Sequence, residues 1–170
     1  MTKTRSRDNR TRQLATLGLL TALALILSYV EVLLPGQPAL PGIKLGLANV
    51  AVLIALWRYG PAAALEVNLA RILLAGLLFT GAFGLLYSLA GGVASFLVMW
   101  LLKKSGRFSV IGVSMAGGVL HNLAQLAVAM AMVSNRALLY YYPVLLLSGL
   151  VTGILLGVLA KLLLSYLPKQ

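Results

Sequence analysis

The run LATLGLLTALALILSYVEVLL, from Leu14 to Leu34, decides the fold class. Glu31 is its only charged residue. A helix of about 20 mostly apolar residues crosses the roughly 30 Å hydrocarbon core of a bilayer. Similar runs recur along the 170-residue chain, of which 61% is hydrophobic and only 10% is charged. The sequence therefore predicts an all-α, polytopic membrane protein embedded in the lipid bilayer.

Proline, glycine and charged residues divide the apolar sequence into six predicted transmembrane helices. We expect these spans at about 13–34, 42–57, 61–80, 82–102, 109–133 and 137–165. Together they predict a single six-helix membrane domain over residues 13–167, preceded by a basic cytoplasmic tail at 1–12. The second span is short for a crossing. The segment PGQPALPG, residues 35–42, predicts a loop or a re-entrant turn before it.

The distribution of lysine and arginine predicts the orientation. The net charge is +11, but the basic residues lie at helix ends and not on one face, which argues against a nucleic-acid partner. With the N-terminus inside, eleven of the fourteen basic residues are cytoplasmic, Lys44 and Arg136 are outside, and Arg71 lies within a span. This bias predicts a multi-pass protein of the plasma membrane with both termini in the cytoplasm.

Motifs for catalysis or nucleotide hydrolysis are not found in the sequence. There is no cysteine and no phosphate-binding loop of the G-x-x-x-x-G-K-[ST] type. We therefore expect no catalytic residues, no metal and no cofactor. Any energy for transport would come from a gradient or from a partner protein.

The stretch GGVLHNLAQL, Gly117 to Leu126, places three polar side chains in the fifth predicted span. His121, Asn122 and Gln125 continue a stripe of small residues at spacings of three, four and seven, which is one face of a helix. Two interpretations are open. The three side chains form interhelical hydrogen bonds, worth about 0.6 kcal/mol each on average. Alternatively they line a ligand cavity, because polar groups at membrane depth are commonly functional.

Other spans contribute further candidates for a ligand site. Lys44 and Asn49 lie in the second span, and Tyr87 lies near the outer side. Arg71 shares a helix face with Asn68 but not with Glu66, so it either pairs with Glu31 or contacts an anionic ligand group. The predicted substrate-binding residues are Lys44, Asn49, Arg71, Tyr87, His121, Asn122 and Gln125. The excess of Lys44, Arg71 and Arg136 over Glu31 favours a ligand with a carboxylate, a phosphate or another electron-rich group.

Two pairs of small residues, each four residues apart, occur in the first span. They are Gly18 with Ala22, and Ala24 with Ser28. Small residues at this spacing allow another helix to approach closely. They serve either packing within the bundle or the docking of a separate membrane partner.

Three stretches carry a family resemblance: PGIKLGLANV (41–50), LLYSLAGG (85–92) and GGVLHNLAQ (117–125). They resemble the Gx transporter family, also labelled heptaprenyl diphosphate synthase component I, which is similar to the S components of energy-coupling factor transporters. The resemblance extends from about Leu14 to Leu164. It implies a six-helix bundle that binds a small nutrient from outside and works with a membrane scaffold and two ATPases. S components present an A-x-x-x-A-type face on helix 1, which corresponds here to Gly18 and Ala22.

The alternative family label implies prenyl-chain elongation, which needs clustered aspartates to hold Mg²⁺ on a diphosphate. This chain has one aspartate, Asp8, so we expect it not to be an enzyme. Two functions remain. One is a substrate-binding subunit of a transporter for a small nutrient or vitamin-like molecule. The other is a non-catalytic membrane accessory subunit in isoprenoid (heptaprenyl diphosphate) or quinone biosynthesis. The mid-membrane and outer depth of the polar residues favours the transporter.

Overall fold

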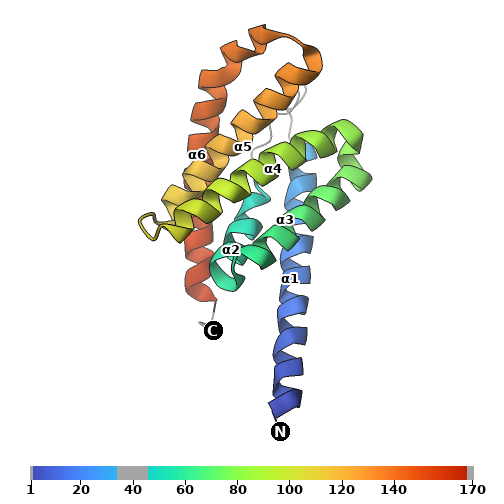
Figure 1. Ribbon diagram of the computed structural model, residues 1–170, viewed down its shortest axis with the longest axis vertical. Helices are drawn as coiled ribbons and strands as arrows, with labels where there is room; N and C mark the ends of the chain where they lie inside the picture. Colours follow the sequence, from blue (N-terminus) through green and yellow to red (C-terminus); the bar gives the residue numbers. More distant parts are fainter. Residues whose placement is uncertain (1, 34–45, 168–170) are drawn as a thin grey trace.

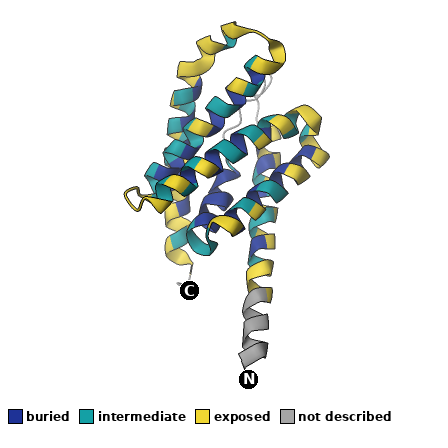
Figure 2. Cartoon of the chain, in the orientation of Figure 1, coloured by how far each residue is buried: buried dark blue, intermediate teal, exposed yellow. Residues whose placement is uncertain are grey.

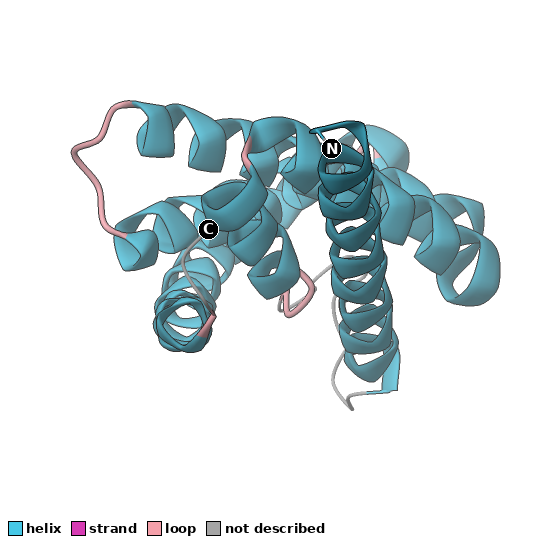
Figure 3. Cartoon of the chain, turned by 90° about the horizontal axis from the view of Figure 1, so that it is seen from below, coloured by secondary structure: helices cyan, strands magenta, loops and turns pink. Residues whose placement is uncertain are grey.

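The computed structural model describes residues 2–33 and 46–167, which form a bundle of helices. Figure 3 shows helices joined by short loops, and the described residues contain no strand. The helices are α1 (Thr2–Leu33), α2 (Asn49–Tyr59), α3 (Pro61–Ala75), the π-helix η2 (Gly76–Thr80), α4 (Gly81–Lys104), α5 (Val110–Val133), the 3₁₀-helix η3 (Arg136–Tyr141) and α6 (Tyr142–Tyr166). The all-α fold class is confirmed.

Helix α1 begins at Thr2, so it includes residues 2–12 of the predicted basic tail. No proline or glycine interrupts residues 2–17, and an established helix extends at one backbone hydrogen bond per residue. Figure 1 shows the N-terminal part of α1 projecting beyond the rest of the bundle. The apolar part of α1, Thr11–Leu33, is long enough to cross a bilayer. The basic residues therefore extend the first span as a helix.

Helix α2 is shorter than the predicted span at 42–57. It starts at Asn49, after a turn in which Gly46 has a positive φ of 75°. Residues 42–45 lie outside the described part of the chain. Eleven residues make a helix of about 16 Å, roughly half of the hydrocarbon thickness. Eight of the eleven are buried, and Figure 2 shows α2 as a mostly buried helix inside the bundle. Within the described residues α2 is a core helix.

Helices α3 and α4 form a hairpin. Pro61 lies in the first turn of α3, where its missing N–H leaves no broken bond. The chain reverses after η2 at Gly81, which has φ 67°, a conformation that glycine adopts without strain. Figure 1 shows α4 returning alongside α3. The Asn68 amide nitrogen of α3 donates to the Gly92 carbonyl of α4 at 2.9 Å, which joins the two helices near their middles.

Helices α5 and α6 approach each other through glycines. Gly149, Gly153 and Gly157 follow one another at intervals of four residues on α6, and Gly118 of α5 faces the first two. A Cβ atom at Gly118 would clash with the Gly149 carbonyl oxygen. One at Gly153 would lie 2.7 Å from the Met115 Cα. The two backbones are therefore in direct contact, as in small-residue helix pairs in membranes.

The exterior of the bundle is apolar. Large hydrophobic side chains face outward on every long helix, for example Leu19 (71% exposed) on α1, Phe83 (68%) on α4 and Leu155 (64%) on α6. Four stretches are long and apolar enough to cross a membrane: Thr11–Leu33, Pro61–Lys104, Val110–Val133 and Arg136–Tyr166. The fold is therefore that of a helical membrane protein. Six crossings remain a prediction, because Pro61–Lys104 contains the hairpin and α2 is short. Figure 1 shows the start of α1 and the end of α6 toward the same end of the molecule.

Candidate functional site

The buried side chain of Arg71 organises a polar cluster in the interior. Arg71 is only 4% exposed. Its Nη2 donates to Asn68 Oδ1 at 2.8 Å and to Asn49 Oδ1 at 3.2 Å, and its Nε donates to Asn68 Oδ1 at 3.1 Å. Asn49 Nδ2 in turn donates to Ser95 Oγ at 3.5 Å. We call these four residues, which come from α2, α3 and α4, the arginine cluster. The predicted site residues Asn49 and Arg71 are thus in direct contact.

Glu31 of α1 balances the charge of this cluster. Its side chain is 2% exposed, and its Oε1 accepts a 2.7 Å hydrogen bond from the Leu47 N–H. The carboxylate is close enough to stabilise the Arg71 guanidinium electrostatically. Glu66, by contrast, is exposed on the other side of α3. The sequence left two possible partners for Arg71, namely Glu31 or an anionic ligand group. The structure therefore places the first of these, Glu31, near Arg71.

The polar stripe of α5 is buried but divides between two neighbouring helices. His121, Asn122 and Gln125 are 2%, 4% and 3% exposed. Asn122 Nδ2 donates to the Leu145 carbonyl of α6 at 2.9 Å. His121 and Gln125 instead face α4 at Gly91. Asn122 thus forms an interhelical hydrogen bond with α6, while His121 and Gln125 pack against α4.

The glycine pair Gly91–Gly92 lies between the two groups of polar side chains. A Cβ atom at Gly91 would be 2.9 Å from the His121 ring and 3.0 Å from Gln125 Cγ. A Cβ atom at Gly92 would be 3.2 Å from Asn68 Oδ1 and 3.3 Å from Arg71 Nη2. Bare backbone therefore allows polar side chains of α3 and α5 to approach α4 from both sides. Sequence reasoning did not assign this role to the pair, and the adjacent glycines within an apolar helix were the available signal.

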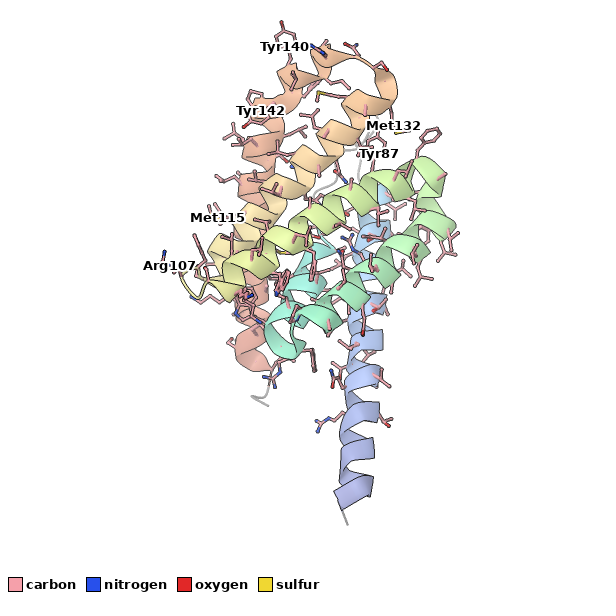
Figure 4. All side chains as sticks on the ribbon, in the orientation of Figure 1. Tyr87, Arg107, Met115, Met132, Tyr140 and Tyr142 are labelled. Carbon is pink, nitrogen blue, oxygen red and sulfur yellow. The ribbon has the colours of Figure 1, made fainter. Side chains whose placement is uncertain are left out.

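The other predicted residues are placed less centrally. Tyr87 is partly buried on α4, one turn before Gly91, in the half of the helix nearer the α3–α4 turn (Figure 4). Lys44 lies outside the described residues. Arg136 is exposed at the start of η3. Three basic residues, Lys44, Arg71 and Arg136, led us to expect an anionic ligand. Of these, the described residues show only Arg71 inside the bundle, and its charge already has Glu31 nearby.

The small pairs of α1 point in different directions. Ala24 and Ser28 are buried and pack within the bundle. Gly18 and Ala22 are exposed, and a Cβ atom at Gly18 would meet nothing within 4 Å. The pair assigned to partner docking is therefore the pair that this chain leaves uncovered.

Metal binding finds no support in the described residues. Over residues 11–33 and 46–167, no group of three or more histidine, cysteine, aspartate or glutamate side chains could hold an ion. The arrangement instead suits hydrogen bonding to a polar, organic group, since amides and a guanidinium dominate it.

An apolar helical bundle with a buried, hydrogen-bonded polar centre defines the class as a helical membrane protein. The chain belongs to the family of heptaprenyl diphosphate synthase component I, which matches residues 20–163. This name describes one component of a larger assembly. No curated protein and no solved structure matches the chain.

Proposed function

We propose that the protein is the substrate-binding membrane subunit of an energy-coupling factor type transporter, which takes up a small nutrient or vitamin-like molecule. The buried polar centre, which consists of the arginine cluster, Glu31, His121 and Gln125, carries this proposal. It brings together side chains of α1, α2, α3, α4 and α5 inside a bundle whose exterior is apolar. Polar and charged groups at membrane depth are costly and usually line a substrate path or a relay.

The family description favours a second candidate, a non-catalytic membrane accessory subunit of heptaprenyl diphosphate or quinone biosynthesis. Its catalytic partner would be a separate chain, because prenyl transfer needs clustered aspartates and this sequence contains only Asp8. Such a subunit would act through surfaces that meet the partner in the cytoplasm. It would have no need for an arginine cluster in its interior, and for this reason we favour the transporter.

The proposed partners follow from what the chain lacks. Without a phosphate-binding loop it needs separate ATPase subunits and a membrane scaffold that couples them to the bundle. The uncovered pair Gly18 and Ala22 supports docking of that scaffold on α1.

We further propose a plasma-membrane location with both termini in the cytoplasm. The positive-inside bias supports this orientation, and so does the position of the start of α1 and the end of α6 at one end of the molecule. Reporter fusions at Gln170 and within 35–42 are expected to give cytoplasmic and external signals, respectively. An external signal from Gln170 would contradict the six-crossing topology.

Substitution on the open face of α1 separates docking from binding. Gly18→Leu and Ala22→Leu are expected to reduce uptake, because a bulky side chain in a small-residue interface costs about 1–3 kcal/mol, or roughly 5- to 150-fold in complex formation. Ligand retention by the purified subunit is expected to stay unchanged. Ala127→Leu, an exposed alanine on α5, is the matched control and should leave uptake intact. Normal uptake by both α1 variants would contradict docking at this face.

A further inference from the structure

Gln125 differs from the other buried amides of the bundle. It is 3% exposed, and neither its Nε2 nor its Oε1 has a hydrogen-bond partner among the described residues. Asn122, one turn away on the same helix, donates to the Leu145 carbonyl. Asn49 and Asn68 are both bonded within the arginine cluster. The amide of Gln125 therefore has both its donor and its acceptor capacity unused.

An unused buried amide needs a physical explanation, because it loses its bonds to water without gaining others. An ordered water would be one, but each of its polar atoms exposes less than 1 Å². A water-sized void with several polar neighbours is therefore not present beside it. A group that enters when the protein binds its substrate would supply both missing partners.

The surroundings indicate where such a group enters. Gln125 Cγ and the His121 ring both lie against α4 at Gly91, where the helix presents bare backbone. The next residue, Gly92, faces the arginine cluster. A modest separation of α4 from α5 at this point would admit a flat polar group between Gln125 and the centre of the bundle.

We propose, on the basis of the transporter function above, that Gln125 recognises an uncharged edge of the substrate in which a donor and an acceptor are adjacent. A lactam, an imide or a primary amide presents this edge, and a glutamine amide pairs with it through two hydrogen bonds. Glu31 and Arg71 are the only buried charged side chains in the described part of the chain, and their charges offset each other. The described interior thus favours an uncharged, polar substrate over an anionic one.

A stability comparison tests whether Gln125 is reserved for a ligand. Gln125→Met removes the amide at similar volume, and Asn122→Leu removes an amide that is already bonded. In ligand-free protein we expect Gln125→Met to leave the Tm unchanged or to raise it, and Asn122→Leu to lower it. A fall in Tm for Gln125→Met as large as that for Asn122→Leu would make Gln125 a structural residue and overturn the proposal.

A retention experiment tests the substrate class. Wild-type and Gln125→Met protein are incubated with a low-molecular-mass metabolite extract of the expressing cells, and bound molecules are identified by native mass spectrometry and fragmentation. We expect wild type to retain a molecule with an N–H next to a carbonyl, and Gln125→Met to bind it roughly 5- to 150-fold more weakly, for the loss of two hydrogen bonds. Equal retention by both, or retention of a molecule without this edge, would overturn the role of Gln125 but leave the transporter function standing. Retention of nothing by wild type would contradict the transporter function itself.

Discussion

Replacing Arg71 with methionine is expected to lower the free energy of unfolding by about 3–5 kcal/mol, because it removes a buried positive charge that offsets a buried carboxylate and leaves buried amide oxygens without their donor. The change removes the positive charge that stabilises Glu31, whose side chain is 2% exposed. It also removes the donor to the side-chain oxygens Asn49 Oδ1 and Asn68 Oδ1. Thermal or denaturant unfolding in detergent measures the loss.

The double variant Glu31→Gln with Arg71→Met supplies the control. Because it removes both charges, we expect it to recover a large part of the stability lost by Arg71→Met alone, which gives a coupling energy of about 1–3 kcal/mol. Additive losses in the double variant would contradict an electrostatic pairing of Glu31 with Arg71.

Replacing Gly153 with leucine is expected to disrupt the contact between α5 and α6, at a cost at or above the usual range of about 1–3 kcal/mol for overpacking. The first carbon of the new side chain would lie 2.7 Å from Met115 Cα and 2.8 Å from the Ser114 carbonyl oxygen. These are backbone atoms of a helix, so they cannot rotate away as a side chain can. The helices would have to separate along their length.

Gly18→Leu is the matched control for Gly153→Leu, because both insert the same side chain into a helix. Nothing lies within 4 Å of the position of a Cβ atom at Gly18. We expect the yield and the Tm of Gly18→Leu protein to equal those of wild type, while those of Gly153→Leu fall. Equal behaviour of the two variants would contradict the tight α5–α6 packing.

The helical membrane class was predictable because hydropathy alone specifies it, but the length of α2 was not. Residues 42–57 read as a short span, whereas helix α2 is confined to Asn49–Tyr59 and is largely buried. An apolar run does not reveal whether it faces lipid or protein. The predicted basic tail continues α1 as a helix over residues 2–12, a conformation that its charge alone does not indicate.

The candidate site was predictable where one helix determines it. The spacing of Asn68 and Arg71 places them on one face, and they are hydrogen-bonded. The α5 stripe was expected to act as one surface, but residues 121 and 125 are just over one turn apart and face α4. Residue 122 is rotated from 121 by about 100° and faces α6. Contacts between helices, such as Asn49 with Arg71, depend on packing that the order of residues does not express.

The small pairs of α1 illustrate the same limit. Gly18 with Ala22 and Ala24 with Ser28 have identical spacing, yet one pair is exposed and the other is buried. The spacing of two residues indicates that they share a helix face, but it does not indicate which face the rest of the bundle covers. The three-dimensional arrangement therefore separates a packing pair from a candidate docking pair.

Native mass spectrometry of the wild-type protein, purified in detergent from its own membranes, tests the central claim most directly. If the buried polar centre binds a substrate, the spectrum will contain the chain with one small molecule bound, and the molecule will be released on unfolding. A chain that carries no small molecule, and that instead elutes in a fixed ratio with a soluble prenyl-diphosphate synthase subunit, would contradict the transporter function and support the accessory role.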